Sequence, residues 1–600
     1  MAFCDGHRRS PSGAEGYQSH GELSPHQRSP AGVPLCAGKW LRFRRECIIV
    51  RSGNDLRIEY IEGIAAEPAC VRWQRSRPMR RDFRRRDRGT VFHGLVVLLA
   101  LTALALVAAP TGRVEAAEED KIVLALERDQ DNMDPHMHFQ RVGILMNINM
   151  YDSLLHKTPK LQYDPSLATE WRAIDDTTWE FKLRQGVKFH NGDAFSAEDV
   201  KFSIERVIDP ATKSPQYGNI RAIKAVQIID DYTVHLITDG PFPLLLERMV
   251  FFPIIPKKHF EKVGAQAFAE SAPVGTGPYK FVEWKRDQYL HLERFEGHWR
   301  GPAPIKTFII RVIPETSTQI AELKTGGVDI VRNLPPDLMP DLKAHPGTYV
   351  SAAPILRTHY VALDMRHPPF DKKEVRQAAN YAIDRQAVID KLMGGLGRIV
   401  PTVINPMAFG YDPTVEAYGY DPKKAKELLA QAGYPKGVDI TLHTGFGHAW
   451  GRQLGEAIAD MLTQVGLRTS LRIWDPGPAW NKFFQGEGKA TNGFYGSWGY
   501  YSTFDADAIL HPLYHTEPGG WVGKWYTRVP GLDALIDEAR STVDREKRLA
   551  TYSKIQRLIK EEAPSIFLWY QYDMLGINRR IDYEARGDEW IWVYDAKLKK

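Results

Sequence analysis

Cysteine is missing from residues 79–600, since all four cysteines, Cys4, Cys36, Cys47 and Cys70, precede that long stretch. A disulfide framework and a catalytic thiol are therefore both excluded there. A cysteine that would carry a lipid anchor behind an export signal is excluded as well. Any chemistry of residues 79–600 must come from other side chains.

Common catalytic motifs are also absent. The sequence has no P-loop, dinucleotide glycine fingerprint, Gly-x-Ser-x-Gly elbow or His-Glu-x-x-His in a suitable context. Gly275 and Gly277 are followed by Pro278 and Tyr279, which predicts a tight turn rather than a nucleotide-binding loop. These absences disfavour nucleotide-dependent enzymes, serine hydrolases of that type and zinc proteases.

An excess of positive charge is absent from the main part of the chain. The full sequence has a net charge of +5, but residues 1–116 hold 19 Lys and Arg against 11 Asp and Glu. Residues 117–600 hold 60 against 63, a net charge of −3. Overall charge therefore gives no argument for binding nucleic acid or an anionic membrane. An alternative interpretation of the Arg-rich N-terminal part is an arm that binds nucleic acid.

What is present is a predicted export signal at 79–117. Arginines are dense at 80–88, Leu95–Ala109 carries no charge, and Val114–Ala117 offers small residues for cleavage. This order is typical of a secretory signal peptide, and the uncharged run is short for a membrane span. The mature protein is expected to begin near Ala117 and to be soluble and periplasmic. Arg80 and Arg81 weakly suggest the twin-arginine export route.

Residues 1–78 precede the signal, although a signal peptide should itself come first. They are rich in Arg, Gly, Ser and Pro and show no sustained apolar period. The simplest interpretation is that translation begins at Met79 and that residues 1–78 are a start-site misassignment. The alternative is a disordered extension.

The 484 residues from 117 onward are too many for one hydrophobic core, so two or three domains are expected. Strand-like and helix-like stretches alternate without an internal repeat, which predicts an α/β chain with mixed sheets. The clearest strands lie at 121–126 and 232–237. Helices are predicted to begin at Ser196, through a capping box, and at Pro422. Apolar residues at three-to-four spacing predict helices over 374–392, 452–465 and 545–562.

Aromatic residues are dense, with thirteen tryptophans after residue 117. Trp498, Tyr500 and Tyr501 crowd a glycine-punctuated segment that leads into Asp505 and Asp507. Aromatic walls with a few charges hold peptides, sugars or cations, so this segment is predicted to bind ligand. Two alternatives stay open: the rings belong to the core, or the two acids are a carboxylate pair for glycosidic cleavage.

His136 and His138 are two positions apart, the spacing of one face of a strand, and are candidate metal or ligand contacts. No third ligand is tied to them by sequence. We therefore predict neither a metal nor a cofactor.

Six segments of the chain occur in the order found in one protein family. They are Leu167–Phe202, Gly275–Tyr279, His298–Pro302, Gly326–Ile330, Pro369–Arg385 and Asp421–Tyr434. On these segments the chain resembles the extracellular solute-binding proteins of peptide/nickel-type ABC importers across nearly all of residues 121–575. None of the segments offers an obvious ligand group, so they identify a scaffold and leave the site to be argued separately.

The resemblance implies a two-lobe periplasmic-binding-protein fold of the class II type, with an extra subdomain inserted in the first lobe. The implied divisions are 118–160, 270–357 and 566–600 for lobe I, 161–269 for the inserted subdomain, and 358–565 for lobe II. The chain is expected to cross between the lobes near Arg357–Leu363 and again near Ala563–Tyr570. The cleft between the lobes is expected to close on the solute by hinge motion.

The resemblance also implies a function. The protein is expected to be a monomer without enzymatic activity that captures a peptide-like or other small organic solute and delivers it to an ABC-transporter permease in the inner membrane. The predicted ligand-binding residues are Trp498, Tyr500, Tyr501, Asp505, Asp507, His136, His138, Arg357 and Trp480.

One departure from the family bears on the solute. Peptide-binding members usually carry an aspartate three residues after the tryptophan matched by Trp498, and here that position is Tyr501. Either the acid has shifted to Asp505 or Asp507, or the solute is a sugar, an opine or a metal complex, as in other members. A secreted hydrolase that uses the two histidines or the two acids, and chaperone-like binding of unfolded chains, are the alternatives.

Overall fold

The structure is a computed structural model that describes residues 47–52, 55–60, 120–138, 141–445, 449–473, 492–499, 503–516 and 522–599. Two compact units make up the chain, Met1–Gly112 and Arg113–Lys600. In the first unit, β1 (Cys47–Ser52) and β2 (Asp55–Tyr60) form an antiparallel hairpin, which the composition of residues 1–78 did not predict. The predicted signal peptide at 79–117 lies outside the described residues.

The second unit is built on one large mixed sheet. Its strand order is β10-β11-β12-β3-β13-β19-β14-β18-β16-β17, and β15 pairs with β19. The strands are β3 (Lys121–Leu126), β10 (Tyr279–Lys285), β11 (Tyr289–Arg294), β12 (Thr307–Val312), β13 (Ile330–Val331), β14 (Thr348–Leu363), β15 (Gly397–Ile399), β16 (Val438–Thr444), β17 (Leu467–Ile473), β18 (Gly493–Gly499) and β19 (Ser565–Asn578). Parallel pairs such as β3 with β12 and antiparallel pairs such as β14 with β19 share this sheet. The predictions of a mixed sheet and of a strand at 121–126 are confirmed.

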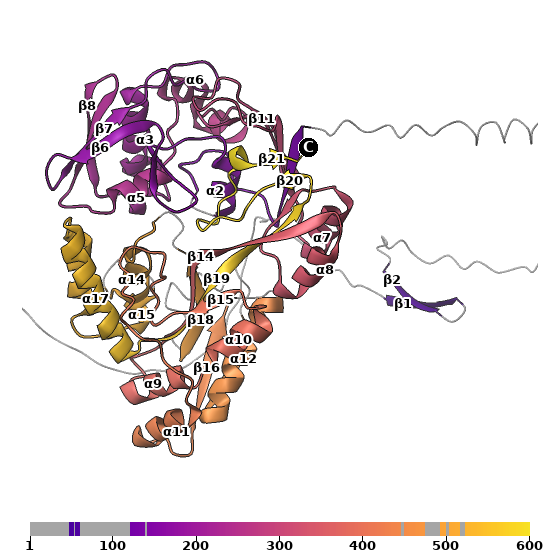
Figure 1. The fold of residues 1–600 in the computed structure, drawn as a ribbon, viewed down its shortest axis with the longest axis vertical. Helices are drawn as coiled ribbons and strands as arrows, with labels where there is room; N and C mark the ends of the chain where they lie inside the picture. The colour runs from indigo at the N-terminus through magenta and orange to yellow at the C-terminus, as the bar shows by residue number, and fades with distance from the viewer. Residues whose placement is uncertain are drawn as a thin grey trace, which may run out of the picture. The chain divides into compact units, whose positions relative to one another are not determined.

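Two long strands, β14 and β19, run side by side through the middle of the second unit (Figure 1). They pair antiparallel, starting with Thr348 opposite Asn578. Successive side chains of a strand point to opposite faces, and β14 is buried on both: Tyr360 belongs to one core cluster and Val361 to another. The crossing predicted near 357–363 falls in β14, and the crossing predicted near 563–570 falls at the start of β19.

Helices cover both faces of the sheet around β14, β16 and β18. One core cluster is formed with α9 (Lys373–Tyr381), α10 (Arg385–Leu392), α11 (Pro422–Gln431) and α12 (Ala449–Val465). The other is formed with α14 (Asp507–Tyr514), α15 (Gly523–Tyr526), α16 (Leu532–Ser541) and α17 (Arg545–Glu562). Figure 1 shows the first group gathered around β16, with α14, α15 and α17 of the second group on the other side of β18.

The other end of the sheet packs against α2 (Arg141–Asn147), α7 (Thr316–Thr325) and α8 (Met339–Ala344). The short pair of β20 (Ile581–Asp582) with β21 (Lys597–Leu598) packs here, whereas the pair of β4 (Leu155–Lys157) with β5 (Tyr163–Pro165) packs against residues 168–173 and 245–250. None of the helices in the described part of the chain is long and apolar enough to cross a membrane.

A separate four-stranded sheet lies within the predicted inserted subdomain, residues 161–269. Its order is β6-β7-β9-β8, and all pairs are antiparallel. The elements are β6 (Ala168–Ala173), β7 (Thr178–Leu183), α3 (Ala197–Ile208), α4 (Tyr217–Ile220), β8 (Ile223–Asp230), β9 (Thr233–Thr238), α5 (Leu245–Val250) and α6 (Lys257–Glu270). This sheet has its own core cluster, in which Phe181 and Val200 are fully buried.

Helix starts follow the capping signals in the sequence. At the start of α3, the Asp199 carboxylate accepts a hydrogen bond from the backbone N–H of Ser196 at 3.0 Å, the acidic half of the predicted capping box. At the start of α11, Asp421 accepts from the backbone N–H of Lys424 at 2.9 Å, with Pro422 at the first helical position. The predicted helix over 545–562 is α17, with the same bounds.

The predicted continuous helix over 374–392 is wrong. The structure has two helices, α9 and α10, separated by residues 382–384. Asp384 caps α10, because its side chain accepts from the backbone N–H of Ala387 at 3.0 Å. The apolar spacing runs through the break and hides it, so the capping aspartate was the only local signal.

Gly275 and Gly277 are needed for a close approach between two backbones. A Cβ at Gly275 would lie 2.2 Å from the carbonyl oxygen of Met150, and one at Gly277 would lie 2.5 Å from the carbonyl carbon of the same residue. The backbone N–H of Gly277 donates to that oxygen at 2.9 Å. The family-like segment at 275–279 is therefore structural.

Candidate functional site

A cavity of about 400 Å³ lies where β14 and β19 meet α7, α12 and β18. Ligand sites commonly enclose about 300–1,000 Å³ and combine apolar walls with a few polar groups. Its charged and polar lining includes Glu127, Arg332, Arg357, His359, Gln571 and Asp573, and its aromatic lining includes Trp450 and Tyr572. We call this space the hinge cavity and take it as the candidate site, because its walls combine segments from both predicted lobes.

Strand register brings part of this lining together. Arg357 and His359 are two apart on β14 and so project from the same face. Across the antiparallel pair with β18, Arg357 lies opposite Gly499 and His359 lies opposite Ser497. Because Gly499 has no side chain, the space beside Arg357 is left open on that strand. Small residues on β18 thus make room for the two long side chains of β14.

His359 is held in place through both ring nitrogens. Its Nε2 lies 2.5 Å from Gln571 Oε1, and its Nδ1 lies 3.0 Å from the hydroxyl of Tyr495. Burial raises the pKa of Tyr495, so the phenol beside Nδ1 keeps its proton. With Oε1 of Gln571 as the acceptor, the ring proton is assigned to Nε2.

Three arginines converge on one residue at the edge of the cavity, Glu589: two contact its carboxylate and the third contacts its backbone oxygen. The Arg357 Nη2 donates to Glu589 Oε2 at 2.8 Å, and Arg141 forms an ion pair with the same oxygen. Arg332 Nη2 donates to the backbone oxygen of Glu589 at 3.2 Å and lies 3.4 Å from Asp573 Oδ2. Burial raises the pKa of Glu589, while Arg357 opposes that shift. We call these five residues the arginine cluster.

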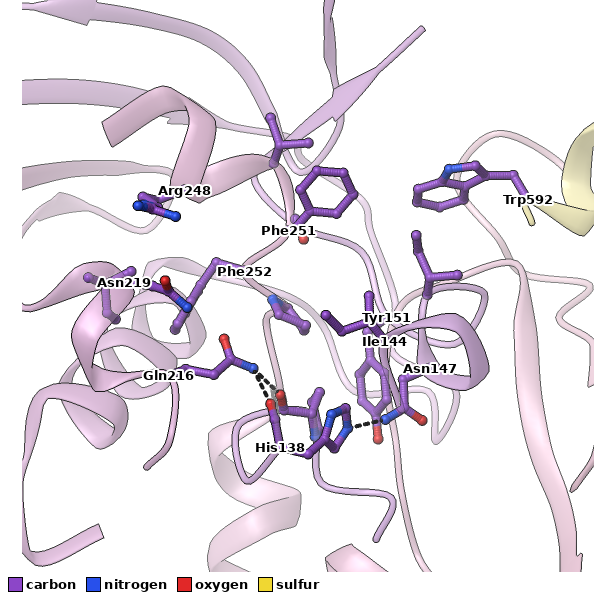
Figure 2. A pocket seen from close by; sticks show the side chains of 16 residues that line it. His138, Ile144, Asn147, Tyr151, Gln216, Asn219, Arg248, Phe251, Phe252 and Trp592 are labelled. Atoms are coloured by element: carbon purple, nitrogen blue, oxygen red, sulfur yellow. Dashed lines mark hydrogen bonds between the residues drawn. The ribbon is translucent and has the colours of Figure 1, made fainter. Parts of the chain in front are cut away.

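A second, much smaller cavity of about 50 Å³ contains one of the predicted histidines (Figure 2). His138 lines it; its Nε2 lies 2.7 Å from Asn147 Nδ2, and Gln216 Nε2 donates to its backbone oxygen at 3.2 Å. Burial lowers the pKa of His138 to about 4. This volume holds little more than water, so the hinge cavity is the better candidate for an organic solute.

His136 is buried outside both cavities. Its Nε2 lies 2.8 Å from the Pro253 carbonyl oxygen, and Arg206 Nη1 lies 3.0 Å from its Nδ1. Since a guanidinium only donates, Nδ1 must accept, and the ring proton sits on Nε2. Burial lowers the pKa of His136 to about 4. Both ring nitrogens are therefore engaged within the protein, which leaves no lone pair for a metal.

Asp505 is buried and neutralised by an internal cation. Arg548 donates to its two oxygens at 2.6 and 2.9 Å, and the Tyr552 hydroxyl donates at 2.6 Å. Burial raises the pKa of Asp505, and Arg548 opposes that shift. Asp507 is also buried, and its Oδ1 lies 3.1 Å from Nε of Arg540. Neither acid lines the hinge cavity, so their predicted role in binding stays a prediction.

Trp498 lies on the face of β18 opposite the hinge cavity lining. Its ring packs, partly buried, against the core cluster that contains Tyr360 and Phe504. Its Nε1 donates to the backbone oxygen of Ala508 at 2.8 Å. Tyr500, Tyr501 and Trp480 lie outside the described residues. Of the six predicted site residues that the structure describes, Arg357 is the one that lines the hinge cavity.

Sequence reasoning missed most of the arginine cluster. Arg141, Arg332 and Asp573 lie far apart in the chain, Glu589 follows soon after the strand that carries Asp573, and the register of no single element brings the four together. Glu589 also has a positive φ of 65°, which the sequence does not reveal for a residue other than glycine. Only the folded chain places these charges at one point.

Comparison with known proteins supports the scaffold. Residues 162–521 match the model of the middle region of bacterial extracellular solute-binding proteins, family 5. Heme-binding protein A of Haemophilus influenzae is 30% identical over 468 residues, covering 72% of this chain and 83% of the relative. Glutathione-binding protein GsiB of Pectobacterium atrosepticum is 28% identical over 493 residues, covering 80% and 93%.

Solved structures show the same fold. The periplasmic binding protein DppA of Helicobacter pylori, in complex with the peptide STSA, is 27% identical with a TM-score of 0.68, covering 80% of this chain and 98% of its own. CtaP of Listeria monocytogenes, at 22% identity and a TM-score of 0.73, covers 80% and 99% and supports the fold alone. The predicted two-lobe periplasmic-binding-protein fold is confirmed, and these family members and neighbours are binding proteins rather than enzymes. The chain belongs to the bacterial extracellular solute-binding proteins of family 5, as its six sequence segments predicted.

Proposed function

We propose that this protein captures a peptide-like or other small organic solute in the hinge cavity and delivers it to an ABC-transporter permease. The relatives that support this proposal carry names for glutathione and heme binding, and one neighbour holds a peptide. The observation that carries the proposal is the hinge cavity itself, with about 400 Å³ between polar and aromatic walls. That volume suits a solute of a few residues or a compact organic acid.

Motion of the lobes would accompany capture. β14 and β19 are the strands in which the predicted crossings fall, so bending within them would open or close the cavity. Contacts between the predicted inserted subdomain and residues 503–504 would break on opening: Arg248 Nη1 donates to Thr503 Oγ1 at 2.6 Å, and Glu247 Oε2 accepts from the Phe504 N–H at 3.3 Å. Small-angle scattering should show a contraction when solute is added, and no change would contradict this motion.

We propose a receptor rather than a hydrolase. A hydrolase would need a free base, nucleophile or metal site. His136 has both ring nitrogens engaged, and Asp505 is neutralised by Arg548. Incubation with candidate peptides and sugars should return them unchanged, whereas turnover would support the enzyme.

Mass spectrometry of co-purified solute is the direct test. Protein purified from its own cells should release one class of small molecule when it is denatured. A matched variant, Ser497→Phe, places a large ring in the cavity lining on β18 and should release much less. Wild-type protein that releases nothing and binds no candidate solute in calorimetry would contradict the proposal.

Export and assembly complete the proposal. The signal at 79–117 would direct export, and its cleavage would release a soluble periplasmic monomer that begins near Ala117. N-terminal sequencing of the exported product checks this, and the presence of residues 1–78 on that product would contradict both the cleavage and the start at Met79. Sedimentation of the same material reports the oligomeric state.

A further inference from the structure

The predicted inserted subdomain contacts the predicted lobe II through α5. Arg248 Nη1 donates to Thr503 Oγ1 at 2.6 Å, and Glu247 Oε2 accepts from the backbone N–H of Phe504 at 3.3 Å. Figure 1 shows α5 at the side of the subdomain nearest α14 and α17. The two hydrogen bonds join different core clusters, since Leu245 of α5 belongs to one and Phe504 to another. We call Glu247, Arg248, Thr503 and Phe504 the interlobe latch.

Three residues of the latch are buried: Thr503, Phe504 and Glu247 are 1%, 6% and 8% exposed. The Glu247 carboxylate is held in place from its own predicted lobe. Its Oε1 accepts from Lys157 Nζ at 3.0 Å and from the Tyr163 hydroxyl at 2.5 Å, which leaves Oε2 for the Phe504 N–H. Lys157 Nζ also lies 4.9 Å from the centre of the Phe504 ring. The subdomain therefore presents a fixed, charged acceptor, and charge-assisted hydrogen bonds are stronger than neutral ones.

Aromatic rings pack beside the latch. The centre of the Phe504 ring lies 6.1 Å from that of Phe251, and the Phe251 ring lies 5.6 Å from that of Trp590. Phe251 packs against three core clusters, of which one contains Phe504 and another contains Trp590. Separation of the predicted lobes would expose part of this apolar surface to water. Its burial therefore favours the same arrangement as the two hydrogen bonds.

The latch is distinct from the candidate site. Among the described residues that line the hinge cavity, none belongs to the latch. A change in the latch should therefore leave the contacts between solute and cavity intact and alter only the balance between open and closed forms. When only the closed form holds the solute, the apparent dissociation constant rises as the fraction of closed protein falls. Latch and solute are thus linked through this balance alone.

We propose that the interlobe latch consists of positioning residues that raise solute affinity by stabilising the closed form without touching the solute. This inference rests on the proposed function, because it concerns the closing step of the same capture. The latch contributes the same free energy whatever the solute is, so it multiplies every affinity by one factor. It also slows release, since both hydrogen bonds must break before the solute leaves. Water replaces both bonds on opening, so the contribution is modest and the empty protein still opens.

Thr503→Val is the variant that tests the latch. Valine has nearly the shape of threonine but lacks the hydroxyl that accepts from Arg248. In the closed form the guanidinium then loses an acceptor, whereas in the open form water takes the place of the hydroxyl. The cost falls on the closed form, so affinity should drop roughly tenfold or more, as for a lost hydrogen bond to a charged group. The Tm of the solute-free protein should stay close to that of wild type.

Calorimetry should compare two unlike probes, glutathione and trialanine, on wild type and on Thr503→Val. Both dissociation constants should rise by the same factor. Stopped-flow kinetics should trace the loss to faster dissociation, with association nearly unchanged. Glu247→Gln removes the charge that accepts from the Phe504 N–H and should weaken both probes by a common factor as well.

Matched controls lie inside the predicted subdomain. Thr238→Val removes a buried hydroxyl that donates to the Thr177 backbone oxygen at 3.0 Å. Glu180→Gln removes a carboxylate whose partners are Arg172 and His235. All these partners belong to the same subdomain, so both variants should lower the Tm and leave the affinity for either probe unchanged.

The outcomes separate this inference from the proposed function. Unchanged affinity in Thr503→Val, or an equal loss in Thr238→Val, would overturn the latch and leave the proposed function intact. A loss for one probe alone would also overturn it, because the residue would then contact the solute directly. Wild-type protein that binds neither probe and releases no solute on denaturation would overturn both.

Discussion

Replacing Asp505 by Asn should reduce stability and leave solute affinity unchanged. The carboxylate of Asp505 pairs with Arg548 through two hydrogen bonds and also accepts from Tyr552. Both side chains of the ion pair are at most 5% exposed. Asn keeps the shape but removes the charge, so Arg548 is left buried without a counter-ion, at a cost of about 3–5 kcal/mol.

The size of the effect can be expressed as a melting shift. Unfolding entropy of roughly 2.1 cal/mol/K per residue, over roughly 480 residues, gives about 1 kcal/mol/K. The Tm should therefore fall by about 3–5 °C, as measured by calorimetry at neutral pH. Asp507→Asn is the control, because its partner Arg540 is 28% exposed and the loss should be about 1 kcal/mol or less. An unchanged Tm with weakened solute binding would refute this reasoning and would restore Asp505 as a ligand group.

Three further predictions follow from burial. Trp498→Ala should cost about 2–4 kcal/mol of stability, because the ring packs in a core cluster and its N–H is paired; normal melting with weaker binding would contradict this. The pKa of His136 is about 4 in the fold against 6.5 when unfolded, so unfolding takes up a proton and stability falls as the pH drops from 6.5 to 4. Urea titrations across that range should show that the free energy of unfolding falls less steeply with pH in His136→Gln than in wild type, by up to about 1.4 kcal/mol per pH unit. Gly275→Ala should lower stability by about 1–3 kcal/mol, because its Cβ would meet a backbone oxygen at 2.2 Å, whereas Gly218→Ala, with nothing within 4 Å, should have little effect in the same melting assay.

Much of the scaffold could be predicted from sequence, because its signals are local. The strand at 121–126 and the helix at 545–562 are set by apolar periodicity and appear with the same bounds. Capping residues such as Asp421 mark where helices begin. The break before α10 was missed because periodicity continues through it, although Asp384 marks it.

The candidate site was harder to predict, since it depends on distant segments. Density of aromatic residues pointed to Trp498, but that ring faces a core cluster rather than the hinge cavity. The acid nearest to it in sequence, Asp505, has its partner 43 residues away in α17. Arg332 and Glu589 are 257 residues apart and meet only through the sheet. Local patterns carry no information on such pairs.

The position of β19 in the sheet has a consequence for how the chain assembles. β19 is inserted between β13 and β14, which precede it by more than 200 residues of sequence. Until that last long strand arrives, both neighbours present unpaired edges, which are prone to join other chains. When the chain is synthesised or exported from its N-terminus, the edges of β13 and β14 must therefore stay apart from other molecules until β19 has also emerged. Truncation before residue 565 should accordingly yield aggregating material, even though most of the hydrophobic core would still be present.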